Sequence, residues 1–153
     1  MPKFIVDSML GKLAKWLRIL GYDTLYFKKI KPKALVKIAV SEKRIILTRN
    51  SHLSEFIKPN KFIYINSMMI NEQLKQLISS FKLNKKSGLF SICTICNKKV
   101  KEIKKENVKD KVPPYVFQEN SLFYICPKCK RLYWMGSHYH HTIKKIENLR
   151  KEI

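Results

Sequence analysis

A strand, a helix and a second strand can be assigned to residues 3–26 from their pattern alone, and this unit constrains the fold more than any other part of the chain. The run Phe4-Ile5-Val6 is apolar throughout, as in strands that are covered on both faces. Gly21 stands where a helix ends in a left-handed residue, and residues 24–27 are β-rich again. The pattern predicts two parallel strands joined by a helical crossover. The apolar stripe of the helix comprises Leu10, Leu13, Ala14, Leu17 and Leu20.

Asp7 directly follows the first of these strands. Parallel sheets bind ligands beyond the carboxyl ends of their strands, so this carboxylate stands where an active-site group is expected. An acid or a hydroxyl in front of a helix also satisfies free backbone N–H groups, and Asp7 or Ser8 could instead be the helix N-cap. Both interpretations stay open at this point.

Residues 28–83 continue the alternation of strands and helices. Residues 44–47 and 62–65 have the composition of buried strands, and residues 71–81 have the apolar period of a helix. Asn50, in the segment Thr48-Arg49-Asn50-Ser51, follows strand 44–47 at the same sheet edge as Asp7 and is a second candidate active-site residue. An α/β domain is therefore expected over residues 1–83. A helix that begins near Pro32 presents Ala34, Leu35, Ile38 and Ala39 on one side.

The second half of the chain has a different organisation. Residues 84–91 are polar at first and contain Gly88, which indicates a linker. Two C-x2-C pairs then frame a module expected over residues 92–141, with strands at 121–125 and 131–134. Together these features predict an α/β domain followed by a small β-rich zinc ribbon. Residues 142–153 are expected to form a short, basic C-terminal helix.

The four cysteines are Cys93, Cys96, Cys126 and Cys129. Their spacing is typical of one tetrahedral zinc ion held by four thiolates, and a closed site of this kind stabilises the module without performing chemistry. A redox dithiol and unliganded core cysteines are the alternatives. Three histidines could compete with the cysteines as zinc ligands: His138, His140 and His141. Otherwise they are surface residues, either in contact with nucleic acid or without a role.

The net charge of +21 points to a polyanionic partner. Residues 1–83 carry 16 Lys and Arg against 5 Asp and Glu, and residues 84–153 carry 16 against 6, so both halves are basic. Nucleic acid is the first candidate and an anionic membrane surface the second, while a general lysine bias would leave the shortage of acids unexplained. The sequence shows neither a secretory signal nor an apolar run long enough to span a membrane, so a cytoplasmic protein without membrane attachment is expected.

Three separated segments, FIVDSMLGKLAKWLRILGYDT, IILTRN and CPKCKRLYWMGSHY, together resemble one known family. It is the PIN-like RNase domain with a C-terminal zinc ribbon, named for the C-terminal RNase domain of the mutator-seven exonuclease. The resemblance spans residues 3–139. It implies a PIN-like α/β fold and ribonuclease activity, in which acids at the carboxyl edge of the sheet hold Mg²⁺ or Mn²⁺ and the metal activates water at the scissile phosphate.

Two departures from the family pattern bear on that activity. The family typically has T-R-D where this chain has Thr48-Arg49-Asn50, and it usually has acids where this chain has Lys31-Pro32-Lys33-Ala34. Asp23 begins a strand, where a turn or capping role is expected, and Glu42 is expected to be solvated. Asp7 and Asn50 alone supply too little negative charge to hold Mg²⁺ well. The acids of residues 1–83 are Asp7, Asp23, Glu42, Glu55 and Glu72.

Two hypotheses follow. In the first, the chain is an RNA-binding protein whose catalytic acids are largely lost and which binds structured RNA such as ribosomal RNA or tRNA, alone or in a ribonucleoprotein complex. In the second, it is an active Mg²⁺- or Mn²⁺-dependent endoribonuclease that uses Asp7, with Asn50 as a tolerated ligand. The number of acids favours the first.

Basic and aromatic side chains would contact the RNA in either case. Arg49 is the strongest single candidate, because it follows a strand at the same edge as Asp7. Tyr115, Tyr133, Trp134 and Tyr139 are candidates for base stacking, although Trp134 is better explained as ribbon core. The predicted phosphate contacts are Lys12, Lys15, Arg18, Lys31, Lys33, Arg49, Lys128, Lys130 and Arg131.

Overall fold

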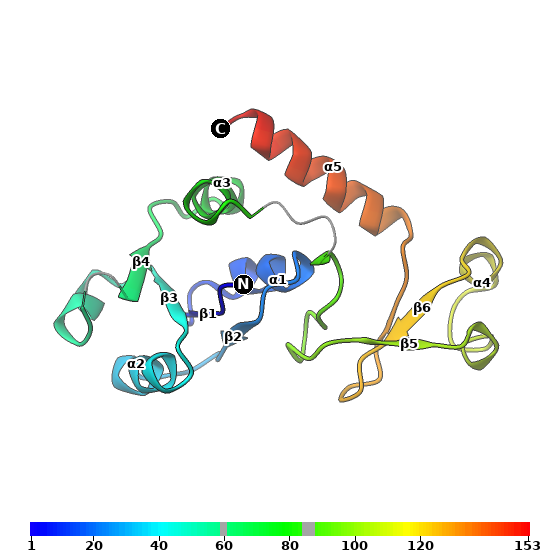
Figure 1. Cartoon of the computed structure of the whole chain (residues 1–153), viewed down its shortest axis with the longest axis horizontal. Helices are drawn as coiled ribbons and strands as arrows, with labels where there is room; N and C mark the ends of the chain where they lie inside the picture. Colours follow the sequence, from blue (N-terminus) through cyan, green and yellow to red (C-terminus); the bar gives the residue numbers. More distant parts are fainter. Residues whose placement is uncertain (59–60, 84–87) are drawn as a thin grey trace.

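The computed structural model describes residues 1–58, 61–83 and 88–153. An α/β part and a ribbon part lie side by side, and the last helix returns from the ribbon to the α/β part (Figure 1). The first half of the expected linker, residues 84–87, lies outside the described residues.

A four-stranded parallel sheet forms the centre of the α/β part, as the sequence predicted. Its strands are β1 (Phe4–Val6), β2 (Thr24–Tyr26), β3 (Ile45–Thr48) and β4 (Phe62–Tyr64), in the order β2-β1-β3-β4. Val6 pairs with both Tyr26 and Leu47, so β1 and β2 end level with each other and β3 extends one residue further. This register brings Asp7, after β1, beside Thr48 at the end of β3.

Helices cover both faces of the sheet. Helices α1 (Gly11–Ile19) and α3 (Ile70–Phe81) pack on one face, and α2 (Pro32–Ser41) with the short 3-10 helix η1 (Ser51–Glu55) packs on the other. In α2, Leu35 and Ala39 are buried. Ala34 was expected on the same side but is exposed.

Gly21 ends the first crossover in the left-handed conformation that its position predicted, with φ +88°. A Cβ at this position would lie 2.2 Å from the carbonyl oxygen of Gly88. The second half of the linker therefore approaches the end of α1 at a distance that only glycine allows.

The ribbon, which we define as residues 91–136, is an antiparallel sheet of β5 (Lys101–Ile103), β6 (Phe123–Ile125) and β7 (Leu132–Tyr133). The 3-10 helix η4 (Lys105–Asn107) and the helix α4 (Pro114–Glu119) connect β5 to β6. Val108, Val116 and Phe123 form a small core, and Trp134 packs against it. Trp134 is thus part of the ribbon core, as expected.

The C-terminal helix α5 (Ser137–Lys151) differs from its prediction in two ways. It begins five residues before Thr142, because residues 137–141 continue the helix rather than the ribbon. Its buried side chains Ile146 and Leu149 join the same core as α1 and α3. The α/β part therefore consists of residues 1–83 together with this distant helix, and not of residues 1–83 alone.

No helix in the described part of the chain is both long enough and apolar enough to cross a membrane.

Candidate functional site

Asp7 lies at the carboxyl end of the sheet and is bound by its own chain. Its Oδ2 accepts hydrogen bonds from Thr48 Oγ1 at 2.6 Å and from the backbone N–H of Arg49 at 2.9 Å. Its Oδ1 accepts from the backbone N–H of Met9 at 2.9 Å. The residue is only 9% exposed. The carboxylate therefore fastens the turn after β1 to the end of β3, while the N-cap of α1 is Leu10 rather than Asp7 or Ser8.

Asn50 also has a local structural role. It is the N-cap of η1, and its Oδ1 accepts a hydrogen bond from the backbone N–H of His52 at 3.0 Å. Its own N–H donates to Thr48 Oγ1 at 2.9 Å. Thr48 is thus shared between the two candidate residues, because its hydroxyl donates to Asp7 and accepts from Asn50.

Asp7 and Asn50 both line a cavity of about 340 Å³ at this edge of the sheet. Asp7 is the one carboxylate among the lining residues. One carboxylate that already accepts three hydrogen bonds, with one neutral amide beside it, is a poor donor set for Mg²⁺, which binds to carboxylates, phosphates and water. The other lining residues are Ser8, Met9, Ile30, Pro32, Leu35, Thr48, Arg49, Ser51 and Leu53.

The other acids of the α/β part lie elsewhere. Glu42 is exposed, as expected, and also bonds to Arg44; Glu72 pairs with Lys75, and Glu55 lies 3.6 Å from His52. None of these carboxylates lines the cavity that contains Asp7.

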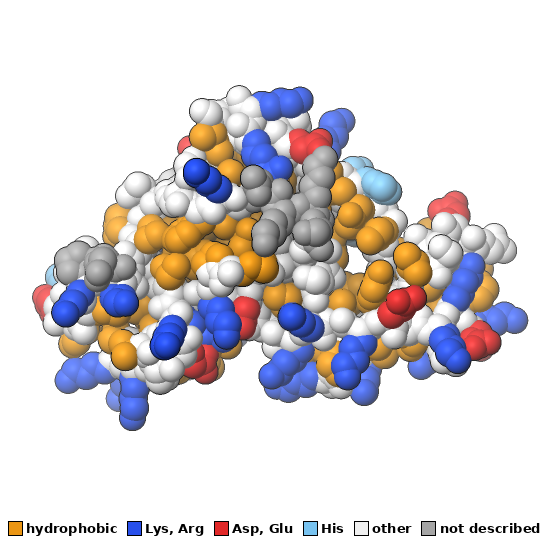
Figure 2. All heavy atoms as spheres, in the orientation of Figure 1, with side chains coloured by type: hydrophobic (Ala, Val, Ile, Leu, Met, Phe, Trp, Pro, Cys, Tyr) orange, Lys and Arg blue, Asp and Glu red, His pale blue; other side chains and the backbone are white. Residues whose placement is uncertain are grey.

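The predicted phosphate contacts differ in accessibility. Arg49 is half-buried; one of its guanidinium nitrogens donates to the carbonyl of Ile65 at 2.6 Å, and the group lies over the ring of Tyr64. Space-filling shows Lys and Arg side chains along the lower edge of both parts of the molecule (Figure 2). The exposed candidates are Lys12, Lys15, Lys31, Lys33, Lys128, Lys130 and Arg131.

Arg18 was expected to contact phosphate, but the structure places its side chain inside the protein. It is 7% exposed, and its Nε donates to the carbonyl of Thr24 at 2.9 Å. One terminal nitrogen donates to the carbonyls of Thr94 and Ile95, at 2.9 and 3.2 Å, in the first cysteine turn. Because a phosphate contact requires an accessible guanidinium, Arg18 is better described as a bridge between α1 and the ribbon.

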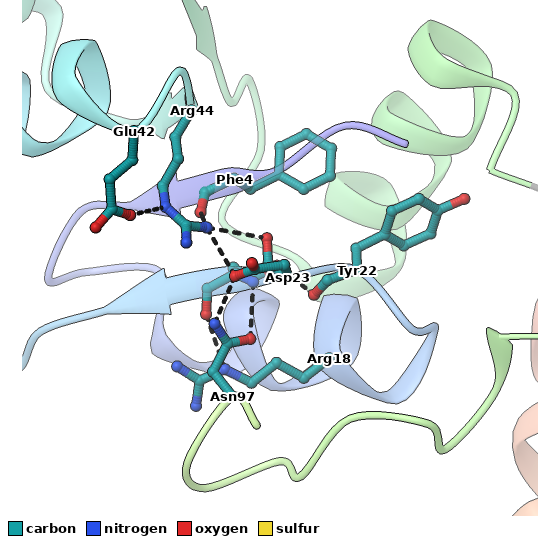
Figure 3. Close-up of polar contacts among 8 residues, drawn as sticks. Phe4, Arg18, Tyr22, Asp23, Glu42, Arg44 and Asn97 are labelled. Carbon is teal, nitrogen blue, oxygen red and sulfur yellow. Dashed lines mark hydrogen bonds and ion pairs between the residues drawn. The ribbon is translucent and has the colours of Figure 1, made fainter. Parts of the chain in front are cut away.

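Asp23, at the amino end of the sheet, extends this bridge (Figure 3). Its Oδ1 accepts from Arg44 at 2.7 Å and from Asn97 Nδ2 at 2.6 Å. The Oδ1 of Asn97 in turn accepts from the backbone N–H of Thr24 at 2.9 Å. Burial alone would raise the pKa of Asp23, but the hydrogen bonds and the charge of Arg44 outweigh it and lower that pKa. Sequence reasoning missed this network.

The four cysteine sulfurs lie within 4.8 Å of one another, and Cys93 Sγ is 3.7 Å from Cys129 Sγ. Four Zn–S bonds of about 2.3 Å in a tetrahedron place sulfurs about 3.8 Å apart, so the cluster can hold a metal ion such as zinc. The cluster comprises the predicted residues Cys93, Cys96, Cys126 and Cys129, whereas His138, His140 and His141 lie on α5.

The two cysteine turns share one backbone conformation. Cys93 N–H donates to the carbonyl of Lys98 at 2.8 Å and Cys126 N–H to that of Arg131 at 2.9 Å. In both turns the residue after the second cysteine, Asn97 or Lys130, is left-handed, with φ 58° or 64°. The resulting backbone N–H groups point at sulfur, as in Cys96 N–H to Cys93 Sγ at 3.4 Å.

Tyr133 supports the cluster directly. Its hydroxyl donates to Cys93 Sγ at 3.1 Å. Tyr133 was a candidate for base stacking, and in the structure its hydroxyl contacts the cysteine cluster instead. Burial raises the pKa of Cys93, but the hydrogen bonds from Tyr133 and from backbone N–H groups lower it more, to about 6. Burial and the neighbouring sulfurs raise the pKa of Cys96 to about 12. Repulsion between neighbouring thiolates contributes to the difference between the pKa values of Cys93 and Cys96, and a bound cation would neutralise that repulsion.

Comparison with known proteins gives one result. The family model of the Mut7-C RNAse domain matches residues 2–146, which is nearly the whole chain. The match is to a family of ribonuclease domains, and it confirms the resemblance inferred from the three sequence segments. The chain belongs to the Mut7-C RNAse domain family. No curated protein and no solved structure matches it.

Proposed function

We propose that this chain is an RNA-binding protein built on a ribonuclease fold, with the metal-binding acids of the nuclease largely lost. The observation that supports this proposal best is the carboxyl edge of the sheet, where the cavity is lined by the single carboxylate of Asp7. That carboxylate is held by Thr48 and by two backbone N–H groups. Such an edge offers phosphate groups cationic and neutral partners without the cluster of acids that collects divalent metal.

The charge distribution supports RNA as the partner. The net charge is +21, and most of the predicted phosphate contacts are exposed. Phosphate neutralisation by Lys and Arg supplies most sequence-independent affinity for nucleic acid and makes it depend on salt. We propose a structured RNA, such as ribosomal RNA or tRNA, in the cytoplasm and in a ribonucleoprotein complex.

The four-cysteine cluster supplies a structural zinc site in this proposal. Cys93, Cys96, Cys126 and Cys129 would hold the ion, whose charge stabilises their thiolates. With four protein ligands no position remains for a reacting water, so the site folds the ribbon and takes no part in cleavage.

A metal-dependent endoribonuclease is the second candidate function. Family membership favours it, together with the position of Asp7 in a cavity at the expected edge. In that case Asp7 and Asn50 would hold Mg²⁺ or Mn²⁺, which would activate water and stabilise charge at the phosphate.

Cleavage of end-labelled structured and single-stranded RNA by the zinc-loaded protein, with Mg²⁺, with Mn²⁺ and with EDTA, tests the choice. We expect salt-sensitive binding and no cuts. The control is Asp7→Asn, whose thermal unfolding must be measured in parallel because Asp7 accepts three hydrogen bonds. Metal-dependent cuts that disappear in a folded Asp7→Asn variant would establish the nuclease and reject the binding-only function.

A further inference from the structure

A cavity of about 550 Å³ lies between the ribbon, α1 and the start of α5, away from the site that contains Asp7. We call it the junction groove. All three parts of the molecule contribute to its lining: Lys15 comes from α1, Tyr115, Arg131 and Trp134 come from the ribbon, and His138 comes from α5.

The ribbon side of the junction groove is aromatic. Tyr115, at the start of α4, is 64% exposed, and its hydroxyl has no hydrogen-bond partner among the described residues. Trp134 is half-buried and packs on Phe123, with ring centroids 6.3 Å apart, while it also lines the groove. Two rings that line one groove, one exposed and one fixed in a core, are aromatic surfaces on which a planar base can stack at small entropic cost.

The rim of the groove is cationic. Lys15 on α1 and Arg131 on the ribbon are both exposed, and within the described chain neither side chain has an ion pair or a hydrogen bond. His138 joins the lining from the first turn of α5, and Glu119 is the one carboxylate among the lining residues. The two cations come from different parts of the molecule, α1 and the ribbon, and both line the groove.

We propose that the junction groove holds one unpaired nucleotide of the bound RNA, with its base against Tyr115 and Trp134 and its phosphate near Lys15 and Arg131. This inference rests on the proposed RNA-binding function and adds a second contact to it. The volume falls in the range of small-ligand sites, and an unpaired base is the part of an RNA that can leave its stack and enter such a space. A fully paired duplex keeps its base faces inside the helix and contacts only the cationic rim.

The two tryptophans of the chain provide the readout. Trp16 lies on α1, with the ammonium of Lys145 over its ring at 4.5 Å, and Trp134 lines the groove. In the Trp16→Phe background the zinc-loaded chain has Trp134 as its single indole. Hexauridylate, which is unpaired, and a blunt RNA duplex of equal phosphate content are each titrated while the fluorescence of Trp134 is recorded. We expect quenching by hexauridylate and little change with the duplex.

Tyr115 supplies a matched pair of variants in the same background. Tyr115→Ala removes the exposed ring, and by the usual contribution of one stacked base it should weaken hexauridylate binding by about 5- to 150-fold. Tyr115→Phe keeps the ring and should bind within about twofold of its parent. Because Tyr115 is 64% exposed, neither change should lower the melting temperature by more than a few degrees.

The outcomes separate the two proposals. Suppose that duplex or structured RNA binds, that hexauridylate leaves the fluorescence of Trp134 unchanged, and that Tyr115→Ala binds hexauridylate as tightly as its parent. This result would reject the proposed nucleotide site in the groove and leave the RNA-binding function in place. Failure of every RNA to bind overturns both. Loss of a dimer in Tyr115→Ala, seen by light scattering without RNA, would assign the groove to a second copy of the chain and also overturn the inference.

Discussion

The two ends of the parallel sheet use similar residues for different purposes. At the amino end, Asp23 bonds to Arg44 and Asn97, and Arg18 bonds to three backbone carbonyls. At the carboxyl end, Asp7 bonds to Thr48 and to backbone, while the lysines of the first turn of α2 and its N-cap stay exposed. Arg18 and Arg44 are thus bound inside the protein at the first end. At the second end Lys31 and Lys33 are left to solvent, and Arg49 is half-buried against Tyr64.

The difference separates a structural polar network from a surface available to a ligand. A buried guanidinium that donates to backbone carbonyls adds to folding and is not accessible to a phosphate. An exposed ammonium adds almost nothing to stability and retains its charge for an external anion. The amino end therefore holds the ribbon against the sheet, and the carboxyl end is the better candidate for RNA contact.

Removal of zinc from the four-cysteine cluster should have the largest effect on stability, and it should disrupt contacts at the amino end of the sheet only. A structural zinc site contributes about 10–16 kcal/mol to folding, so a chelator should unfold the ribbon. The contacts of Arg18 and Asp23 with the first cysteine turn should be lost with it. Amide hydrogen exchange followed by mass spectrometry should show fast exchange in residues 91–136, and slow exchange should persist in β1 and β3.

Two other results would contradict this difference between the two ends of the sheet. Ribbon amides that stay protected in EDTA would mean that the four cysteines form a stable core without a metal. Equal loss of protection in β3 and in the ribbon would mean that both ends depend on the module.

Arg18→Met should be the most destabilising single substitution among the basic residues predicted to bind RNA. Three carbonyls lose their donor, and at about 1 kcal/mol each the free energy of unfolding should fall by about 3 kcal/mol. Lys15→Met on the same helix is the matched control, since Lys15 is exposed, and its effect should stay within about 0.5 kcal/mol. Urea unfolding followed by circular dichroism measures both variants. Equal effects would show that burial of Arg18 has no consequence.

Local patterns predicted the parts of this molecule that depend on neighbouring residues. The first strand–helix–strand unit, the left-handed Gly21 and the four-cysteine cluster were all correct, because each is set by short-range periodicity or spacing. Arg18 was not correctly placed, because its partners Thr94 and Ile95 are 76 and 77 residues away along the chain. A cation beside an apolar stripe looks the same whether water or a distant carbonyl binds it.

The start of α5 was missed for a related reason. Three of its first five residues are histidines, which have a weak helix propensity and were weighed as ligands or surface groups. What fixes the helix is burial of Ile146 and Leu149 against α1 and α3. One signal for the amino-end network was present: Asn97 directly follows a cysteine pair, where asparagine favours a left-handed turn and keeps its amide free to bind.

Asp23→Asn should destabilise the protein moderately and in a pH-dependent way. Its pKa is lowered in the folded state, so its contribution is present above the unfolded value near 4 and is lost as the pH falls through the folded value. At pH 7 the variant should be about 1–2 kcal/mol less stable, because charge-assisted bonds to Arg44 and Asn97 become neutral. The gap between the two proteins should narrow below about pH 4. Chemical denaturation at a series of pH values measures it, and a constant gap would show that the charge of Asp23 has no part in docking the ribbon.

Lys31→Gln with Lys33→Gln should have the smallest effect on folding and a clear effect on binding. Both side chains are exposed, so the free energy of unfolding should change by less than about 0.5 kcal/mol. Each lost phosphate contact should reduce the slope of log affinity against log salt by about 0.7–0.9, as measured with a labelled structured RNA. Lys109→Gln with Lys111→Gln removes the same charge from exposed positions of the ribbon that are not predicted contacts. If that control pair reduces the slope equally, the RNA senses only net charge and the carboxyl end has no special part in binding; a larger change for the Lys31 and Lys33 pair would place phosphates at the sheet edge that holds Asp7.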